Sequence, residues 1–255
     1  MKCIICDSIK FEEIHLYTTP DKYEKYMGIE NVERDWARCM ECGHYQQDRN
    51  YPLADLEKIY EDGYRSFDFR GETIEQAYNK VVKIPNNENS QRCEWFIDNI
   101  GEVETILDIG SGLGVFPEYL SNRSYRVDCV EANAHSRSFI QNKLKMPCYN
   151  EVPDRRYDVI TLVHVLEHFN SLSIWLKHSK QRLLSNGGKL FIEVPDAVEF
   201  DLLEKNHDEF NSCHCHFFTS ENLEKLLNKC GYQVMAEHDI HYKARNLSRI
   251  MMICS

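Results

Sequence analysis

The stretch TILDIGSGLGVFPEYL, from Thr105 to Leu120, decides the fold of this 255-residue chain. It reads as a short apolar strand, a glycine-rich turn and the start of an amphipathic helix, which is the opening of a nucleotide-binding β-α-β unit. The glycines stand at Gly110, Gly112 and Gly114, whereas the dinucleotide fingerprint requires its last glycine at Val115. This departure favours a cofactor without a pyrophosphate.

Acidic residues mark the ends of the first two strands of this unit. Asp108 ends the first strand, where it can accept a hydrogen bond from an ammonium group, and the helix that follows offers N–H groups to a carboxylate. A second strand, YRVDCVEAN, ends in Glu131, 21 residues beyond Gly110, where an acid can bind both ribose hydroxyls. The pairing of turn and acid strengthens the prediction of a nucleotide-binding unit.

Further strands follow along the chain. The apolar run Tyr157–Val163 predicts a buried strand, and the segment Leu183–Asp196 predicts a helix end, a turn at Gly187–Gly188 and another strand. The stretches Tyr232–Ala236 and Arg249–Cys254 are separated by polar residues, so they can pair antiparallel at a sheet edge. The alternation of strands with helices implies a mostly parallel sheet.

Four cysteines near the N-terminus have the spacing of a metal site. Cys3 and Cys6 form one C-x2-C pair, Cys39 and Cys42 form a second, and together they supply the four ligands of a tetrahedral structural Zn²⁺ site. The 32 intervening residues are more than a zinc ribbon usually has, so Phe11–Arg38 must form a hairpin or a loop that returns the chain to the metal. The alternative is four free thiols.

Composition narrows the class of protein. The formal net charge of −11 repels a phosphate backbone, which argues against a nucleic-acid partner. No apolar run approaches the roughly 18 to 20 residues that a membrane span needs, so we expect no membrane insertion. Eleven cysteines without a secretion signal favour reduced thiols and a cytoplasmic location.

The pattern divides the chain into three parts. We expect a zinc-binding module over residues 1–50, a helical linker or lid over 51–92 and the α/β domain over 93–255. The polar segment Asn86–Arg92 reads as a loop that precedes a helix, which places the domain boundary between about residues 80 and 92.

The motifs resemble those of the class I S-adenosylmethionine-dependent methyltransferases. The resemblance covers Cys93–Ser255, and five segments carry it in the family's order: LDIGSGLG, the acid of VEAN, YDVITLVHVLEH, LLSNGGKLFIEVPD and HCHFFTSENLEKLLNKCGY. The cysteine pairs, followed by CGHYQQ and LEKIYEDGY, resemble the zinc-binding segment that precedes this domain in a bacterial subgroup that includes nucleotide-sugar methyltransferases.

This resemblance implies an α/β fold with a Rossmann-like, seven-stranded, mostly parallel sheet, helices on both faces and an antiparallel last strand, plus the small zinc module. The cofactor, S-adenosylmethionine, would lie across the carboxyl ends of the first two strands, with His164 near the sulfonium. The residues implied for its binding are Asp108, Gly110, Ser111, Gly112, Gly114, Glu131 and His164. The adenine-binding position stays open.

Histidines supply the candidates for chemistry, because removing a proton from an acceptor hydroxyl needs a base and a histidine near neutral pKa suits that task. In VHVLEHF, His164 and His168 are four residues apart and would share a helical face. In HCHFFT, the resemblance matches His214 to the family's histidine and leaves His216 in a variable place. The residues that would act on or contact the acceptor are Glu167, His168, His214, His216 and, from the lid, Tyr64.

Each candidate also has a structural interpretation. The histidines can be hydrogen-bonded core residues, and Tyr60 and Tyr64 can be aromatic anchors of a helix. Cys213 and Cys215 suggest a second metal site, but one short cluster lacks the four ligands of a closed site, so packing thiols are the better interpretation.

The leading hypothesis is methylation of a small polar acceptor, such as a nucleotide-activated or phosphorylated sugar or a related precursor of a bacterial polysaccharide (capsule or lipopolysaccharide) or secondary metabolite, with oxygen marginally preferred. One alternative is methylation of RNA or protein, with the zinc module used for docking. Others are a non-catalytic scaffold that binds the cofactor and, least favoured by the glycine spacing, an NAD-dependent oxidoreductase. The sequence leaves the oligomeric state undetermined.

Overall fold

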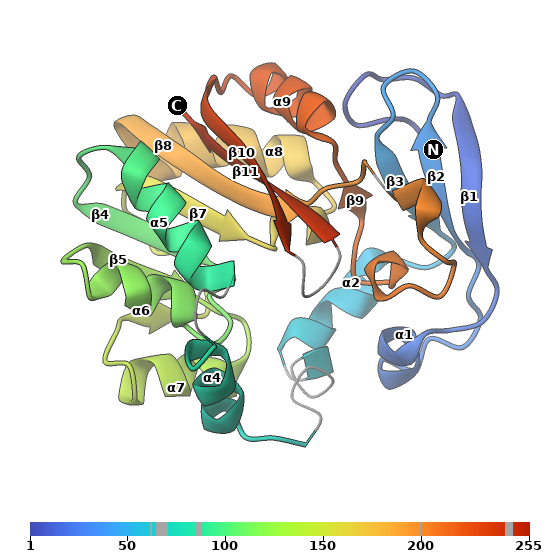
Figure 1. The fold of residues 1–255 in the computed structure, drawn as a ribbon. Coiled ribbons are helices and arrows are strands. Elements are labelled where there is room, and N and C mark those ends of the chain that lie inside the picture. Colours follow the sequence, from blue (N-terminus) through green and yellow to red (C-terminus); the bar gives the residue numbers. More distant parts are fainter. Residues whose placement is uncertain (62, 65–70, 85–87, 199, 243–246) are drawn as a thin grey trace.

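Two sheets organise the molecule (Figure 1). The structure, a computed structural model, describes residues 1–61, 63–64, 71–84, 88–198, 200–242 and 247–255. A seven-stranded sheet has the strand order β10-β11-β8-β7-β4-β5-β6, and a four-stranded sheet has the order β1-β2-β3-β9. None of the helices in these ranges has the length and apolarity to cross a bilayer.

The large sheet has the predicted topology. Its strands are β4 (Thr105–Ile109), β5 (Arg126–Val130), β6 (Cys148–Tyr149), β7 (Tyr157–Val163), β8 (Leu184–Pro195), β10 (Val234–Tyr242) and β11 (Leu247–Cys254). Strands β4 to β8 pair in parallel, and β11 runs antiparallel to both β8 and β10. The prediction of seven strands with an antiparallel last strand is therefore confirmed.

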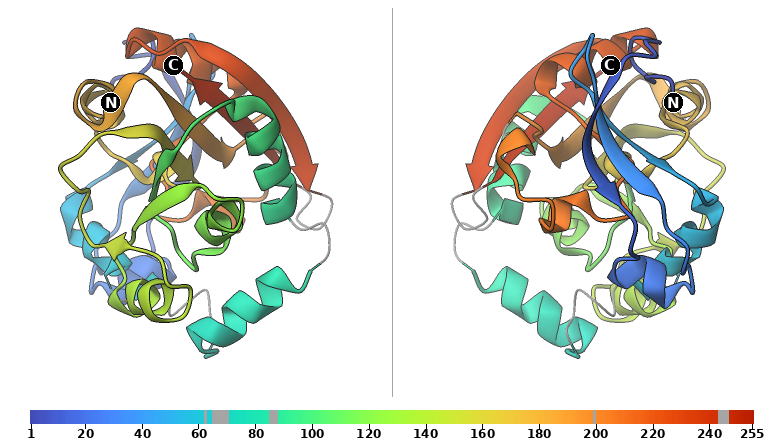
Figure 2. Two further views of the ribbon diagram at one scale, coloured as in Figure 1. Left: turned by 90° about the vertical axis from the view of Figure 1, so that its left-hand side faces the viewer. Right: turned by 90° about the vertical axis from the view of Figure 1, so that its right-hand side faces the viewer.

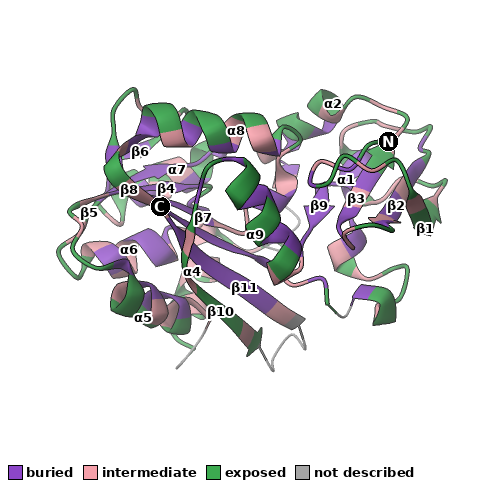
Figure 3. Ribbon diagram, turned by 90° about the horizontal axis from the view of Figure 1, so that it is seen from above, coloured by how far each residue is buried: buried purple, intermediate pink, exposed green. Residues whose placement is uncertain are grey.

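Helices cover both faces of this sheet because its central strands are apolar at successive positions. Ile106 and Val159 point into one cluster with α5 and α6, while Leu107 and Ile160 point into the cluster on the opposite face with α8 and α9. These helices are α5 (Glu88–Ile100), α6 (Val115–Ser121), α8 (Leu172–His178) and α9 (Ser220–Lys229). Figure 3 shows buried strands between helices whose outer faces are exposed.

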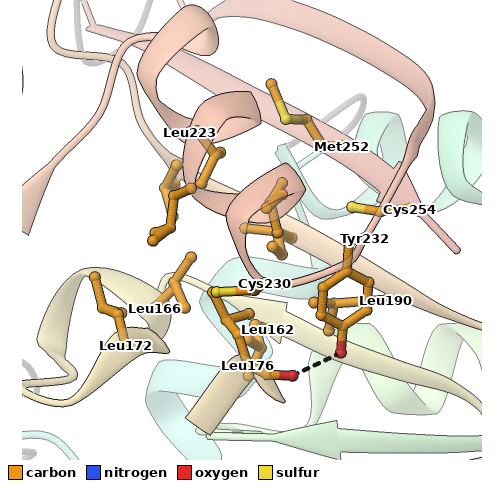
Figure 4. Packing of buried hydrophobic residues seen from close by; sticks show 14 of the residues in the cluster. Leu162, Leu166, Leu172, Leu176, Leu190, Leu223, Cys230, Tyr232, Met252 and Cys254 are labelled. Carbon is orange, nitrogen blue, oxygen red and sulfur yellow. Dashed lines mark hydrogen bonds between the residues drawn. The ribbon is translucent and has the colours of Figure 1, made fainter. Parts of the chain in front are cut away.

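The face under α8 and α9 forms the larger core. Leu172 and Leu176 of α8 pack with Leu223 of α9 over the sheet residue Leu162 (Figure 4). Tyr232, which follows α9, is buried there, and its hydroxyl donates to the carbonyl oxygen of Leu176 at 3.2 Å. The polar tip of this aromatic ring is thus satisfied inside the core.

The small sheet combines three strands from the N-terminal part of the chain with one strand from the C-terminal part. Its strands are β1 (Phe11–Tyr17), β2 (Arg34–Cys39), β3 (Tyr45–Arg49) and β9 (His216–Phe217). Strands β1 and β2 form the hairpin expected between the cysteine pairs. Strand β3 pairs with β9, which comes from the C-terminal domain, and Phe217 stacks on Trp36 with ring centroids 4.7 Å apart. The N-terminal strands therefore share a core with the α/β domain. The right-hand view of Figure 2 shows these strands in blue.

Short helices connect these elements. They are α1 (Lys22–Tyr26), α2 (Leu53–Glu57), η1 (Lys58–Tyr60), α4 (Ile74–Val82), α7 (Ala134–Asn142), η2 (Leu166–His168), η3 (Ser179–Leu183), η4 (Phe200–Leu202) and η5 (Asp208–Phe210). Among them, α4 lies against α6 and α7 beside the ends of β4 and β5 (Figure 1).

Two local predictions need correction. Helix α5 begins at Glu88, so the prediction of a loop as far as Arg92 is wrong for residues 88–92, while residues 86 and 87 lie outside the described part of the chain. The polar residues of this segment suggested an exposed loop, but Arg92 turns inward and is buried as part of the helix. The expected turn at Gly187–Gly188 lies inside β8, where residues 185–188 bulge out between the pairs that Leu184 and Lys189 make with β7.

Candidate active site

A cavity of about 900 Å³ opens at the carboxyl ends of β4, β5 and β7. Open α/β sheets bind ligands at this edge, where the order of the strands reverses. Side chains from α2, η1 and the residues just after η1, all in the N-terminal part of the chain, also line the cavity. All the predicted cofactor and acceptor residues except Gly114 and His216 are among those that line it.

The glycine turn is tied to the neighbouring strand. The N–H groups of Gly110 and Ser111 donate to the carbonyl oxygen of Val130, at 2.8 and 3.0 Å. Gly110 has φ +72°, and a Cβ atom there would lie 2.5 Å from a methyl group of Val165, so a side chain is excluded. Gly114 has φ +76°, and a Cβ there would lie 2.7 Å from the nearest side chain. Gly114 thus allows α6 to pack and does not line the cavity.

The two acids at the strand ends are held in fixed positions. The carboxylate of Glu131 accepts hydrogen bonds from the backbone N–H groups of Gly112 and Asn133, at 2.7 and 2.9 Å. The carboxylate of Asp108 accepts from the Thr161 hydroxyl at 2.6 Å. Burial raises the pKa of Asp108 to about 6, although the Thr161 hydrogen bond opposes this rise.

A row of buried charged side chains forms part of the cavity wall, with Glu193 behind the others. Arg92 donates two hydrogen bonds to Glu193, whose Oε1 lies 3.0 Å from His164 Nε2. His164 Nδ1 in turn lies 3.5 Å from Oε1 of Glu167. Burial opposes ionisation of both acids. Arg92 and His164 nevertheless lower the pKa of Glu193 to about 2, and the hydrogen bond from His164, with the neighbouring histidines, lowers the pKa of Glu167 to about 2. Burial also disfavours a charged His164, yet the two acids outweigh it and raise its pKa.

The backbone at His164 departs from the prediction. His164 has φ +54°, in the left-handed region that side chains rarely adopt, and a 3-10 turn over Leu166–His168 follows. His164 and His168 therefore do not share a helical face. Strain of this kind is commonly found at functional sites.

His168 and His214 form a pair on the same wall. Their ring centroids are 4.8 Å apart. His168 Nδ1 lies 3.0 Å from both the Tyr60 hydroxyl and the Cys213 carbonyl oxygen, and His214 Nδ1 lies 2.6 Å from the Glu209 carbonyl oxygen. Burial, helped by repulsion from His214, lowers the pKa of His168 to about 4, so His168 is neutral at neutral pH.

Two further candidates occupy different positions. The ring of Tyr64 lines the cavity between Tyr23, with centroids 5.4 Å apart, and His168, with centroids 6.1 Å apart. His216 is buried in β9, where its Nδ1 lies 3.1 Å from His44 Nε2. This position assigns His216 to packing between the sheets, and its contact with an acceptor stays a prediction.

Several cavity residues escaped the sequence analysis. Arg92 lay in a segment interpreted as a loop, and Arg249 lay in one interpreted as an edge strand. Arg249 is only 2% exposed, and its Nε has no hydrogen-bond partner in the described part of the chain. Glu193 supports the wall from behind, and an acid inside the apolar run LFIEVP was a signal that could have revealed it.

The four N-terminal cysteines fit a Zn²⁺ ion. The Sγ atoms of Cys3 and Cys42 are 3.6 Å apart, those of Cys6 and Cys39 are 3.5 Å apart, and all four lie within 4.8 Å of one another. Tetrahedral Zn–S bonds of about 2.3 Å place sulfur atoms roughly 3.8 Å apart, and a disulfide would need about 2.05 Å. Cys213, which the sequence had suggested for a second site, joins no such group within the described ranges.

Comparison with known proteins agrees with this geometry. A family model for a methyltransferase domain matches residues 74–237. No curated protein matches the chain significantly. Many solved structures do, which is consistent with a widespread fold.

Three of these structures illustrate the likeness. The 1,6-didemethyltoxoflavin-N1-methyltransferase of Burkholderia thailandensis has 15% identity and a TM-score of 0.56, over 85% of this chain and 97% of that one. The magnesium protoporphyrin IX methyltransferase of Synechocystis has 16% identity and a TM-score of 0.52, over 78% and 91%. The 4+2 cyclase SpnF has 11% identity and a TM-score of 0.51, over 64% and 79%.

At these identities the solved structures establish the fold alone, and one of them is named for a different reaction. The family model covers well over half of the chain and is specific for methyltransferase domains. The chain belongs to this methyltransferase-domain family, and its resemblance to the class I S-adenosylmethionine-dependent methyltransferases is confirmed.

Proposed function

We propose that the protein transfers a methyl group from S-adenosylmethionine to a small polar acceptor, with oxygen as the preferred accepting atom. One observation carries this proposal: the glycine turn with Asp108 and Glu131, and the pair His168 and His214 with Glu167, line the same cavity. A cofactor site and a set of proton acceptors thus face a common space, which methyl transfer to a hydroxyl requires.

The first wall fits the cofactor. Both oxygens of Glu131 accept backbone N–H groups, which holds the carboxylate at the end of β5, where an acid can bind the two ribose hydroxyls. Asp108 is ionised above about pH 6 and can accept from the ammonium group. The cavity lining includes eight acidic side chains and two arginines, which suits a ligand with two positive centres. When bound, the cofactor supplies an electrophilic methyl group.

The second wall can take the acceptor's proton. His168 is neutral at neutral pH because burial lowers its pKa to about 4, so its free nitrogen can accept a hydrogen bond from a hydroxyl. Glu167 stays ionised, since neighbouring histidines lower its pKa to about 2 despite its burial. The negative charge of Glu167 stabilises His168 once it holds the proton. His214 and Tyr64 would orient the acceptor beside it.

The acceptor that we favour is a nucleotide-activated or phosphorylated sugar, or a related precursor in polysaccharide or secondary-metabolite biosynthesis. A volume of about 900 Å³ lies near the upper end of the range for small-molecule pockets, which supports a cofactor and a small acceptor together. Arg249 supports an anionic group on that acceptor, because its Nε is a spare donor in the described structure. The acid-rich lining weighs against RNA.

The N-terminal residues 1–50 would act as a structural zinc module. Four thiolates leave no open coordination position, so the ion would organise the fold. Residues of this module and of the linker 51–92 reach the cavity, including Tyr23, Tyr60 and Tyr64, which supports a role for the linker as a lid. None of the eleven cysteines, all of which lie in the described ranges, forms a disulfide, which supports a cytoplasmic location.

A product screen tests this proposal. The zinc-replete protein is incubated with S-adenosylmethionine and pools of activated sugars and phosphorylated metabolites, and mass spectrometry follows the gain of one methylene unit. We expect methylation of one acceptor class, its loss in Glu131→Gln, and its retention in the matched control Glu104→Gln, an exposed position. Methylation confined to RNA or protein, or cofactor binding without any product, would contradict the proposal.

A further inference from the structure

Glu167, His168 and His214 form a cluster whose geometry goes beyond proton transfer. One potential ligand atom from each residue lies within 4.8 Å of the other two. Glu167 and His214 are buried, His168 is half-buried, and all three line the cavity. The cluster is thus shielded from bulk water on one side and open to small molecules on the other.

The tautomers of both histidines can be deduced from their neighbours. Nδ1 of His168 lies 3.0 Å from the carbonyl oxygen of Cys213, and Nδ1 of His214 lies 2.6 Å from that of Glu209. A carbonyl oxygen can only accept, so each Nδ1 carries the proton and each Nε2 keeps a lone pair. Metal-binding histidines are held in this way, with the other ring nitrogen donating to a carbonyl or carboxylate.

Glu167 adds an acceptor that no group in the described structure satisfies. Its carboxylate is 1% exposed; Oε1 lies 3.5 Å from His164, and Oε2 has no hydrogen-bond partner among the residues described. A buried, unpaired carboxylate oxygen is unfavourable unless a cation or a donor reaches it. Two imidazole lone pairs and this oxygen are all acceptors, so a cation satisfies them together.

We propose that Glu167, His168 and His214 bind one divalent transition-metal ion, with the remaining coordination positions open to the cavity. Two imidazoles and a carboxylate suit Zn²⁺, Fe²⁺, Co²⁺ or Ni²⁺ better than Mg²⁺ or Ca²⁺, which prefer oxygen ligands. The excess of acidic over basic side chains in the lining attracts the same cation.

The open positions give this ion a use, and this use rests on the proposed methyl transfer. A hydroxyl of the acceptor bound to the ion has a lowered pKa and releases its proton to water in the cavity, which leaves an oxygen ready to accept the methyl group. The ion then replaces His168 as the group that activates the hydroxyl. It also adds positive charge beside Arg249 for a phosphate on the acceptor.

Cobalt titration of the intact, zinc-loaded protein tests the site, with elemental analysis to count both metals. We expect one Zn²⁺ retained at the cysteines and one Co²⁺ taken up, with weak visible bands of nitrogen and oxygen ligands and no sulfur charge-transfer band. His168→Gln and His214→Gln should each weaken Co²⁺ binding by more than about tenfold, because each removes a ligand. The exposed control His178→Gln should bind like the parent protein.

Two outcomes would overturn the inference: no metal uptake beyond the zinc of the cysteine site, or a Co²⁺ affinity in both histidine variants equal to that of the parent protein. Circular dichroism and retained zinc show whether each variant is folded. Calorimetry with S-adenosylhomocysteine on the same samples separates this inference from the proposed function. Cofactor affinity without Co²⁺ uptake removes the metal site alone, whereas Co²⁺ uptake without cofactor affinity removes the methyltransferase proposal alone.

Discussion

The cysteine quartet and the cluster of Glu167, His168 and His214 are both able to hold a cation, but they differ in chemistry and surroundings. The quartet offers four sulfur ligands, and Cys3 and Cys39 are buried in the same core cluster as α8 and α9. The cavity cluster offers three nitrogen and oxygen ligands beside open space. Four ligands close a tetrahedral site and three leave it open, so we assign the first cluster to folding and the second to chemistry.

The largest effect should follow from Cys39→Ser, because it removes one of the four ligands of the closed site and places a polar side chain in an apolar core. We expect loss of the zinc and a destabilisation of more than about 4 kcal/mol, measured by thermal unfolding and elemental analysis. Cys230→Ser is the matched control, since Cys230 lies in the same core cluster and belongs to no metal group in the described structure. Cys230→Ser should keep the zinc and lose less stability than Cys39→Ser. An equal loss of stability in both variants would show that the cysteine quartet has no special role in folding.

His168→Gln should have the opposite profile. We expect turnover to fall by roughly 10² to 10⁴-fold, which is the usual effect of losing a group that takes part in proton transfer. The unfolding temperature and the zinc content should stay near those of the parent protein. Initial rates with a methyl acceptor and a thermal melt on the same sample check both parts. A variant that keeps its turnover but unfolds at a lower temperature would show that His168 stabilises the fold and does not activate the acceptor.

Cofactor binding should depend on pH through Asp108. Burial raises the pKa of this carboxyl to about 6, so it is ionised above that pH and can accept from an ammonium group. As the pH falls below 6 the carboxyl becomes protonated, and affinity for S-adenosylhomocysteine should fall by up to about tenfold per pH unit. Calorimetry between pH 5 and pH 8 measures this, and Asp108→Asn should bind weakly without the transition. A parent protein with constant affinity would exclude Asp108 from the cofactor site.

The smallest effect is expected at Tyr60, which lies behind His168. Its hydroxyl lies 3.0 Å from His168 Nδ1 and 3.3 Å from the Cys213 carbonyl oxygen. Tyr60→Phe removes both contacts, and loss of the one to His168, worth about 1 kcal/mol, should reduce turnover about fivefold. Cofactor affinity should not change. A Tyr60→Phe effect as large as that of His168→Gln would mean that the tyrosine acts directly on the acceptor.

Local sequence patterns predicted one half of this comparison well. Cys3 and Cys6 form one knuckle, and Cys39 and Cys42 form another, so spacing brings the thiols together within each pair. The two pairs meet because β1 and β2 form the expected hairpin. The same holds for the turn after β4 and the acid after β5, because parallel strands bring their carboxyl ends to one edge. Each of these features is recognised from a few consecutive residues, and the structure has them at the expected ends of the strands and at the expected hairpin.

The other half depends on contacts between distant segments. His214 reaches His168 because β9 pairs with β3 and holds the preceding loop against the cavity, and no spacing encodes that pairing. His164, with its left-handed backbone, and Arg92, with its inward side chain, both contact the buried Glu193. Long-range pairing of polar groups is what the sequence patterns could not reveal.

Titration of S-adenosylhomocysteine into the zinc-replete protein by calorimetry tests the central claim most directly, since everything proposed for the cavity depends on the cofactor site at Glu131. We expect one binding site per chain, an affinity at least about tenfold weaker in Glu131→Gln because a charge-assisted contact is lost, and no binding of NADH. A folded parent protein that gives no heat with this ligand, or that binds it no better than Glu131→Gln does, would contradict the account.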